Sequence, residues 1–465
     1  MISAKLVWAP WPYRAGFGIT DDTDAATMEQ VKAVYDHLLA KKIRTTKTVW
    51  AFEPAEKCGI PATPDSTLRG VTLQDTEYLA YCKMLAENNY EICLHGASAG
   101  NNKRVATLKA FELLQREIGV SDTFICHSKN ADNIYWNHKI TSLFPFRQLL
   151  QRMNKFECSG EIEGSPWFWG DLCSRKVNNI RLLRTRDTNT LKRNPSMPYY
   201  SPEKPFVNGW FSATKRSLAD CTSPAALNRL VNENGMTILY QYLHRYADPQ
   251  TLKLNKKFTD AIDTLAANKL ILVDTVSNLL KRLRLIQGVF IVHRENTMWI
   301  LNTNNEPVPK LQLALSANTA LTSEDCEVNV NENHLVIREL PRHGIAKLNS
   351  SEPIDVAGPR CYYKKKSDNL FFKLPAGSIA INLSKHSWNL SNGTILEPGT
   401  FLLNAKESGT GNPILSLIPR GEEFSLLMGQ IWIVAREILF KGRSMNSDKF
   451  LDSSKEIKLE NHENW

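Results

Sequence analysis

Ionisable side chains follow short apolar runs in the first 250 residues. Asp21 and Asp22 end "FGITDD", His95 ends "EICLH", and His127 ends "FICH". His244 ends "MTILYQYLH" in the same way. A divalent ion held by a carboxylate and imidazoles lowers the pKa of bound water, and a second carboxylate can take the released proton. A histidine opposite can protonate a leaving group. These residue types therefore indicate metal-assisted hydrolysis.

Each of these residues also has a purely structural interpretation. Either aspartate, or Asp24, could cap the helix that is expected to begin near Ala25. One cap needs one carboxylate, so the second adjacent aspartate favours a site. A single histidine at a strand end is more often a hydrogen-bonded structural residue. Because three of ten histidines follow apolar runs, we interpret these three as a site and the others as structural.

Alternating strands and helices must position these side chains. The apolar residues of segment 28–39 share one helical face, and the segment 43–52 that follows is β-rich. Further helical patterns, at 72–90, 102–119 and 223–235, each lead into a short apolar run. Repeated units of this kind predict a parallel α/β sheet closed into a barrel or partial barrel. Active sites of such barrels lie at the C-terminal ends of the strands.

The chain divides into three predicted regions. Residues 1–285 are expected to form the barrel, with the aromatic- and proline-rich stretch 130–222 forming long loops over one end. Residues 286–445 combine β-rich runs with turn signals and predict an all-β domain, a β-sandwich. Within it, the apolar run 424–440 is interpreted as two adjacent strands rather than a membrane span, because charged residues interrupt it. Residues 446–465 predict a polar tail.

Composition limits the class of protein. Apolar residues at 42% and charged residues at 23% are ordinary globular values, and the net charge of +9 is spread along the 465 residues. Basic clusters are short, so no nucleic-acid partner is expected. Nine cysteines without a C-x-x-C pair favour free thiols in a reducing compartment. With no secretory signal recognisable at the N-terminus, we expect a cytoplasmic protein without a membrane span; its oligomeric state stays open.

Three fragments, "ITDDTD", "LHGASAGNN" and "ILYQYLH", resemble motifs of the polysaccharide deacetylase family of carbohydrate esterases (nodulation-type deacetylase homology). The resemblance covers roughly residues 10–285. It implies a deformed (β/α) barrel that removes N- or O-acetyl groups from sugars with a divalent metal, usually zinc. By this match Asp21 is the catalytic base, and Asp22 and His95 bind the metal. His244 is the catalytic acid, with Leu243 lining the acetyl pocket.

The chain departs from the family in two motifs. The family has a second histidine four residues after the first, where this chain has Ala99. The third ligand could be His127, which we prefer because neighbouring strand ends converge, or an amide oxygen of Asn101 or Asn102. The Arg-x-Pro-Tyr motif of the family has no clear counterpart. A metal-free, non-catalytic glycan-binding barrel is therefore one alternative, and a metal-dependent amidohydrolase acting on a non-sugar amide is another.

Two tryptophans of "SPWFWGD", Trp167 and Trp169, could form a platform for the substrate. Aromatic faces stack on sugar rings, so both are predicted to bind substrate, together with Leu243 and Asn102. A loop anchored by buried tryptophans is the alternative. The sequence thus predicts a zinc-dependent deacetylase acting on an acetylated sugar or a glycan precursor.

Overall fold

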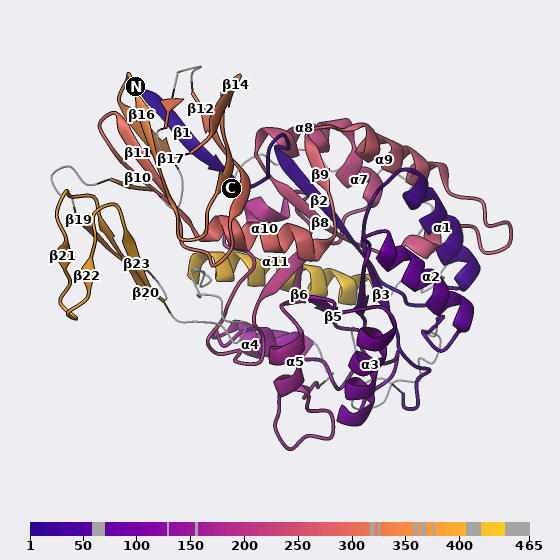
Figure 1. Ribbon diagram of the computed structural model, residues 1–465. Helices are drawn as coiled ribbons and strands as arrows, with labels where there is room; N and C mark the ends of the chain where they lie inside the picture. Colours follow the sequence, from indigo (N-terminus) through magenta and orange to yellow (C-terminus); the bar gives the residue numbers. More distant parts are fainter. Residues whose placement is uncertain are drawn as a thin grey trace.

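The structure is a computed structural model of the 465-residue chain. It describes residues 1–57, 70–127, 130–153, 157–316, 321–323, 326–357, 361–363, 369–374, 377–405 and 420–441. The predicted polar tail, 446–465, lies outside the described residues. Figure 1 shows a barrel ringed by helices, with a group of β-sheets beside it.

Parallel strands form the barrel. They are β2 (Ala15–Asp21), β3 (Thr46–Val49), β4 (Glu91–Leu94), β5 (Thr123–Ile125), β6 (Asn179–Thr185), β7 (Trp210–Thr214) and β8 (Met236–Gln241). They pair in the order β3-β4-β5-β6-β7-β8-β2, and β2 pairs again with β3, which closes a seven-stranded ring. A further strand, β9 (Ile271–Val273), pairs with β2. The predicted parallel barrel is confirmed.

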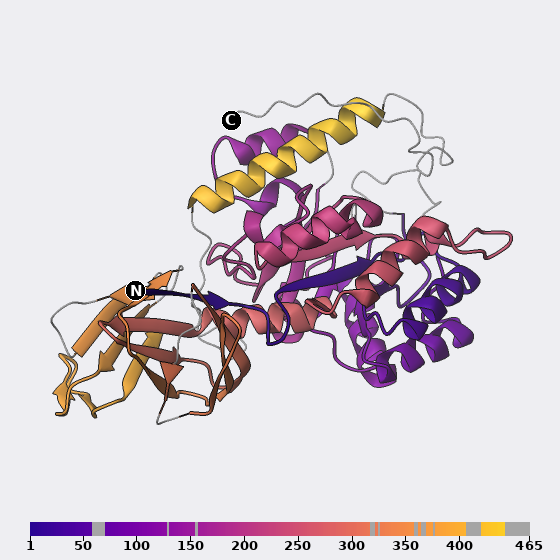
Figure 2. The same cartoon turned by 90° about the horizontal axis from the view of Figure 1, so that it is seen from above.

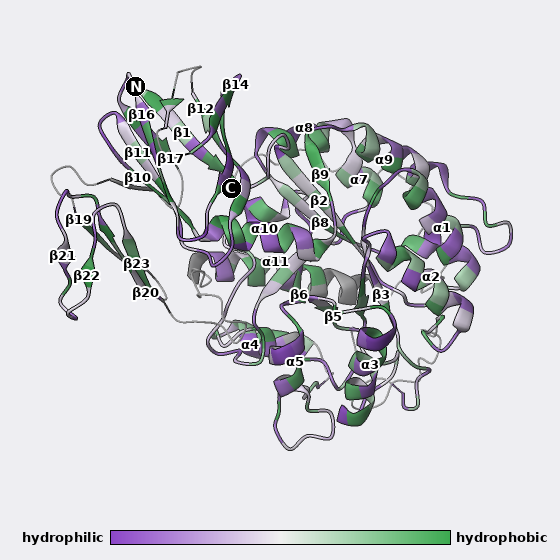
Figure 3. Ribbon diagram, viewed as in Figure 1, coloured by the Kyte–Doolittle hydropathy of each residue, from purple (hydrophilic) through white to green (hydrophobic). Residues whose placement is uncertain are grey.

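Helices cover the outside of the ring, and hydrophobic and hydrophilic residues alternate along them (Figure 3). The longer ones are α1 (Met28–Ala40), α2 (Thr76–Glu87), α3 (Arg104–Glu117), α8 (Pro224–Asn232), α9 (Lys256–Ala267) and α10 (Val276–Gln287). The shorter ones are α4 (Phe146–Met153), α5 (Gly170–Lys176), α6 (Thr190–Arg193), α7 (Leu218–Thr222) and the 3₁₀ turns η1 (Asn137–Ile140) and η2 (Leu243–Tyr246). In α1, Val31, Val34 and Leu38 are buried at helical spacing. Its N-cap is Thr27, whose hydroxyl accepts a hydrogen bond from the Gln30 amide, so no aspartate is needed as a cap.

Two barrel strands lie within the stretch 130–222 that was predicted to form loops. β6 and β7 occupy 179–185 and 210–214, so that prediction was wrong for these residues. The signal for β6 was weak because Arg181 and Arg184 interrupt its apolar run. A buried strand can hold an arginine only if a partner compensates its charge, and sequence patterns do not reveal such a partner.

The region after the barrel is built from strands, as predicted. They are β10 (Val289–Arg294), β11 (Thr297–Asn302), β12 (Val308–Leu315), β13 (Leu321–Thr322), β14 (Val328–Asn331), β15 (His334–Leu340), β16 (Ile345–Ser350), β17 (Ile354–Ala357), β18 (Cys361–Tyr363), β19 (Asn369–Leu374), β20 (Gly377–Asn382), β21 (Trp388–Asn389), β22 (Ile395–Leu396) and β23 (Phe401–Ala405). Among the described residues they form two five-stranded sheets and two smaller ones. The sandwich arrangement stays a prediction.

The first strand of the chain, β1 (Ile2–Val7), belongs to one of these five-stranded sheets rather than to the barrel. It lies between β12, with which it runs antiparallel, and β17, with which it runs parallel. The chain then enters the barrel at β2 and leaves it after α10. The chain thus crosses between the two parts after β1 and again after α10, and its last described element, α11, is back on the barrel.

The last described element, α11 (Arg420–Lys441), is a helix. The prediction of two strands at 424–440 was wrong, because Gly429 does not interrupt the helix and the buried residues, Leu426, Leu427 and Ile433, lie at helical spacing. α11 lies along the outside of the barrel (Figure 2) and packs against β6, α4 and α6. Within the described ranges, no helix has the length and apolar character that a membrane crossing requires.

Candidate metal centre

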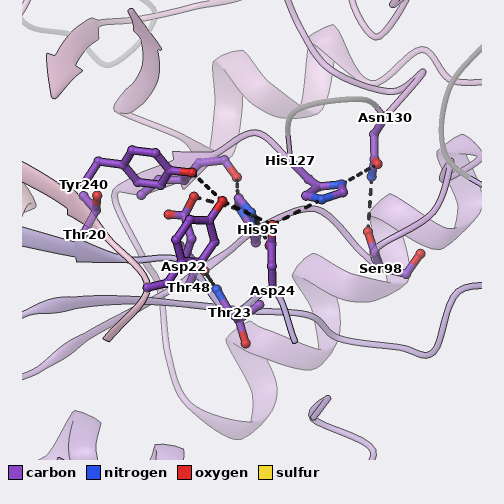
Figure 4. Close-up of polar contacts among 12 residues, drawn as sticks. Thr20, Asp22, Thr23, Asp24, Thr48, His95, Ser98, His127, Asn130 and Tyr240 are labelled. Atoms are coloured by element: carbon purple, nitrogen blue, oxygen red, sulfur yellow. Dashed lines mark hydrogen bonds and ion pairs between the residues drawn. The ribbon is translucent and has the colours of Figure 1, made fainter. Parts of the chain in front are cut away.

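Three buried side chains meet at the C-terminal ends of neighbouring barrel strands. Asp24 follows β2, His95 follows β4, and His127 lies just beyond β5. The possible ligand atoms of the three lie within 4.8 Å of one another. The distance from Asp24 Oδ1 to His95 Nε2 is 3.1 Å, and that from Asp24 Oδ2 to His127 Nε2 is 3.5 Å. Figure 4 shows the two rings on either side of the Asp24 carboxylate.

Hydrogen bonds fix which nitrogen of each ring carries the proton. His95 Nδ1 lies 2.7 Å from the carbonyl oxygen of Ile125, which can only accept, so Nδ1 is the donor. His127 Nδ1 lies 2.8 Å from Asn130 Oδ1. The amide nitrogen of Asn130 donates to the carbonyl oxygens of Ser98 and Gly100, which fixes its oxygen toward His127. In the neutral form, both Nε2 atoms therefore present lone pairs.

The centre consequently holds electron-rich atoms facing one another in a buried space. Asp24 Oδ1 and His127 Nε2 receive no hydrogen bond from any described residue. Two imidazole lone pairs around a carboxylate repel each other unless a cation or extra protons lie between them. Two histidines and one carboxylate, each histidine fixed by a hydrogen bond to its other nitrogen, are a common ligand set for a catalytic divalent metal. The residues present fit such an ion.

Electrostatic interactions couple the three side chains of the centre. Burial raises the pKa of Asp24, but the neighbouring His127 and His95 outweigh it and hold the pKa well below its usual range. Burial lowers the pKa of His127, but the Asp24 carboxylate outweighs it and raises the pKa. The carboxylate thus stays ionised, and the charge that stabilises it in the protein without a metal is a proton held on His127, which a bound cation would displace. Trp50 stacks on His95 and meets His127 edge-on, with ring centroids 6.1 and 5.8 Å away, which fixes both rings.

Asp22, the predicted ligand, lies beside this group rather than in it. Its Oδ2 is 3.7 Å from His95 Nε2. Both of its oxygens accept hydrogen bonds from the Arg181 guanidinium, at 3.1 and 2.9 Å. The guanidinium also stacks over the Tyr240 ring, 4.3 Å from the centroid. Burial lowers the pKa of Arg181, but Asp22 outweighs it and raises the pKa, so the pair is a buried ion pair next to the candidate metal ligands.

Asp21, the predicted base, serves a different part of the barrel. Its Oδ2 accepts hydrogen bonds from Lys47 Nζ and the Tyr35 hydroxyl, each at 3.0 Å. Its Oδ1 accepts from the backbone amide of Leu243 at 2.7 Å. Both oxygens are occupied by donors from β3, α1 and η2. Asp21 therefore ties the turn that carries His244 to the barrel.

His244, the predicted acid, lies in η2 and is buried. Burial lowers its pKa to about 4, so the imidazole is neutral at pH 7. The neighbouring Tyr242 reaches the candidate centre, because its hydroxyl donates a hydrogen bond to Asp24 Oδ2 at 3.4 Å and meets the hydroxyl of Tyr240. The side chain of Leu243 is completely buried in the core.

The other predicted residues have structural partners. Asn102 Oδ1 accepts from the Ser98 hydroxyl at 2.7 Å, and its amide group donates to Gly100 O and Asp132 Oδ2. Trp169 has no exposed surface, packs against Phe124 and donates its ring N–H to Asp132 O. It is a core residue, so the prediction of a sugar platform at Trp169 is corrected.

Trp167 is half-buried, and part of its surface stays accessible. Asn101 Oδ1 accepts from the Ala131 amide, which leaves His127 as the third member of the metal group. The sequence interpretation preferred this residue among the alternatives.

Sequence reasoning missed two central residues. Asp24 was considered only as a helix cap, although a third carboxylate within four residues was a signal of a site. Arg181 was missed because its strand, β6, was not recognised. Once β6 is placed in the ring, its inward-facing arginine lies opposite the strand end of β2, where Asp22 is its partner.

No protein-family model matches the chain, and a search of curated proteins gave no match. Among solved structures, the chain is similar to a protein from Mycobacterium smegmatis assigned to the polysaccharide deacetylases, with 12% identity and a TM-score of 0.35, over 59% of this chain and 93% of the other. It is also similar to PuuE allantoinase (11%, TM-score 0.33, 58% and 91%) and to a family 4 acetyl xylan esterase from Clostridium thermocellum in complex with cobalt (13%, TM-score 0.27, 58% and 91%). Identities and TM-scores this low say nothing about the chemistry of this chain, which depends on its own side chains.

Proposed function

We propose that the protein is a metal-dependent hydrolase whose metal is held by Asp24, His95 and His127. The observation that carries the proposal is the convergence of two imidazole lone pairs on a buried carboxylate that lacks hydrogen-bond donors for one oxygen. Nitrogen and carboxylate ligands suit zinc and similar ions. Compared with the motif-based roles, the ligand aspartate moves from Asp22 to Asp24.

The same shift moves the proposed base from Asp21 to Asp22. A divalent cation at this centre would lower the pKa of water and polarise a carbonyl group. Asp22, 3.7 Å from His95, accepts the proton of the attacking water, while Arg181 orients its carboxylate and compensates its charge. The Tyr242 hydroxyl, held protonated because burial raises its pKa well above the usual value, orients Asp24 by its hydrogen bond.

His244 is proposed to pass a proton to the leaving group. Because its pKa is lowered to about 4, it is neutral before reaction and must first receive the proton that it donates. The proposed substrate is an acetylated sugar or glycan precursor, supported by the order and spacing of the three motifs. Trp167 is the remaining candidate for stacking on a sugar ring. The described cysteines are free, which supports a cytoplasmic location.

The first test is metal content. We expect about one zinc or similar ion per chain in the wild type, and loss of that ion in Asp24→Asn and His127→Ala. Asp22→Asn and Asp21→Asn are matched controls, because each neutralises a neighbouring buried carboxylate and is expected to retain the ion. Elemental analysis after dialysis measures the ratio. Metal retained in Asp24→Asn but lost in Asp22→Asn would contradict the assignment in favour of the motif-based one.

The second test is acetate release from N-acetyl sugars, O-acetyl sugars and non-sugar amides. We expect release from an acetylated sugar by the wild type and a large loss of kcat in Asp22→Asn. Release only from non-sugar amides would keep the hydrolase and replace the substrate class. A wild type that binds no metal even after loading, yet retains a glycan in a pull-down, would overturn the enzyme proposal in favour of a glycan-binding protein.

A further inference from the structure

A polar cavity of about 580 Å³ lies on the barrel wall, apart from the metal centre. It is bounded by the segment 187–193 after β6, by Arg216, two residues after β7, and by the C-terminal part of α8, and it receives one residue of α11. None of its lining residues is apolar. Four are basic and two are acidic: Lys192, Arg193, Arg216, Arg229, Asp187 and Glu233. The lining therefore carries a formal excess of two positive charges.

Both carboxylates of the cavity already have cationic partners. Lys192 Nζ lies 2.6 Å from Glu233 Oε1, and Arg193 Nε lies 2.7 Å from Asp187 Oδ2. The hydrogen bond from Lys192 lowers the pKa of Glu233, so the pair is ionised at neutral pH. The two acids are thus compensated by two of the four cations.

The remaining two guanidinium groups make no ion pair with a carboxylate in the described part of the chain, although Arg216 lies near enough to Asp187, and Arg229 to Glu233, to help lower the pKa values of these carboxyl groups. Arg216 Nε donates to the carbonyl oxygen of Arg186 at 2.6 Å, which anchors the group and leaves its two terminal nitrogens available. Arg229 lies one helical turn before Glu233, and its side chain makes no hydrogen bond or ion pair with a described residue. A guanidinium offers parallel N–H donors that match the oxygens of phosphate or carboxylate.

The cavity walls are held by hydrogen bonds that do not involve these two arginines. Asn189 accepts from the backbone amides of Lys192 and Met236 and donates to Glu233 Oε2 at 2.9 Å. Arg193 Nη1 donates to the Ser425 hydroxyl at 2.6 Å, which fixes the wall contributed by α11. The walls of the site are therefore preformed, and a ligand would have to order only the exposed side chains of Arg216 and Arg229.

We propose that this cavity binds a ligand of sugar size through a phosphate or carboxylate group held by Arg216 and Arg229. The volume lies within the range of small-molecule sites, and the excess of cationic side chains in the lining favours an anionic, hydroxylated ligand over an apolar one. The site shares no residue with the metal centre. It therefore stands or falls independently of the proposed hydrolase activity.

The test is calorimetric titration of the full chain with inorganic phosphate, glucose 1-phosphate, glucuronate and neutral glucose. We expect binding of at least one anion, no binding of glucose, and an affinity that falls as salt rises. In the double variant Arg216→Gln/Arg229→Gln we expect the affinity to fall at least about tenfold, the equivalent of losing roughly 1.4 kcal/mol. Arg44→Gln, which removes an exposed arginine elsewhere on the barrel, is expected to bind like the wild type.

The anions distinguish the source of the charged group. Tighter binding of glucose 1-phosphate or glucuronate than of inorganic phosphate supports a sugar-borne anion, and equal binding of the two phosphates supports recognition of the phosphate group alone. No binding of any anion overturns the proposal. So does binding that is unchanged in the double variant, which would place the anion elsewhere. Thermal melting of each variant verifies that it is folded.

Discussion

Two adjacent carboxylates in a buried strand end are stable here because each has its own cation. Asp21 pairs with Lys47 and Asp22 with Arg181, and all four side chains are buried. Neighbouring residues of a strand point to opposite faces, so the two carboxylates are directed to different partners. Asp24, two residues after Asp22, differs from both. Its neighbours are His95 and His127 rather than a lysine or an arginine, so its charge is available to a metal ion.

The two buried ion pairs give a prediction at the residue scale. Removing one partner leaves an uncompensated buried charge, so Lys47→Met and Arg181→Met are each expected to lower the free energy of unfolding by about 3–5 kcal/mol. Only Arg181→Met is expected also to lower kcat, because Arg181 orients the proposed base. Urea unfolding and acetate release measure the two effects. Arg44→Met, on the surface, is the control; an equal loss of kcat in Lys47→Met would return the base role to Asp21.

His244 gives a prediction about pH. Its pKa falls from 6.5 to about 4 on folding, mainly through burial, so the unfolded chain binds the additional proton at pH values between these two. The stability that neutral His244 contributes is complete above pH 6.5 and is lost as the pH falls toward 4, by roughly 3 kcal/mol.

Variants test which residue causes this pH dependence. Unfolding free energies measured from pH 7 to 4 should fall less steeply in His244→Gln than in the wild type. His334, whose pKa is also lowered to about 4 but whose side chain is more exposed, serves as the comparison in His334→Gln. An unchanged slope in His244→Gln contradicts the assignment.

At the scale of elements, the sequence predicted what periodicity and turn signals encode. The helical face of 28–39 became α1, and the apolar runs "EICLH" and "FICH" became β4 and β5 with histidines at their ends. The predictions were wrong for β6 and α11, whose residue types are unusual for the elements that they form. β6 carries Arg181, whose charge is compensated by Asp22, a residue far away along the chain. α11 is apolar on more than one face, so its pattern did not distinguish a helix from strands.

The loop between β4 and α3 gives a prediction at this scale. The backbone carbonyl oxygen of Gly100 accepts a hydrogen bond from the side-chain amide of Asn130. Asn130 in turn orients His127. A Cβ at Gly100 would lie 1.8 Å from the backbone oxygen of Glu56, so one of the two segments must move. We therefore expect Gly100→Ala to weaken metal binding, measured by competition with a chelator, as well as to lower stability.

The control for this loop lies in α11. Nothing lies within 4 Å of a Cβ added at Gly429, and alanine is the better helix former. Gly429→Ala is therefore expected to raise the free energy of unfolding by about 0.5–1 kcal/mol without changing metal affinity. Equal metal affinities in Gly100→Ala and Gly429→Ala would show that the loop between β4 and α3 does not influence metal binding.

At the scale of the whole molecule, β1 joins the N-terminal segment to sheets made from the second half of the chain. Ala4 is buried in the middle of this strand and faces the core, whereas its neighbour Lys5 is exposed. Ala4→Asp would place an unpaired carboxylate in that core, and we expect a loss of about 3–5 kcal/mol.

Lys5→Asp introduces the same side chain one residue away and is expected to change stability little. Limited proteolysis should cut the β-sheet region of Ala4→Asp first, while the barrel still binds metal. Simultaneous loss of both parts would indicate that they unfold as one cooperative unit.

The position of β1 also sets an order of events during translation. Ser3 and Ser316 are hydrogen-bonded but lie 313 residues apart, so the ribosome releases β1 long before it makes β12 or β17. During that interval the barrel has all of its strands available, while β1 waits as an unpaired apolar segment, the kind of species that aggregates or recruits a chaperone. The nascent chain must therefore keep β1 in solution until β12, the first of its partner strands, emerges.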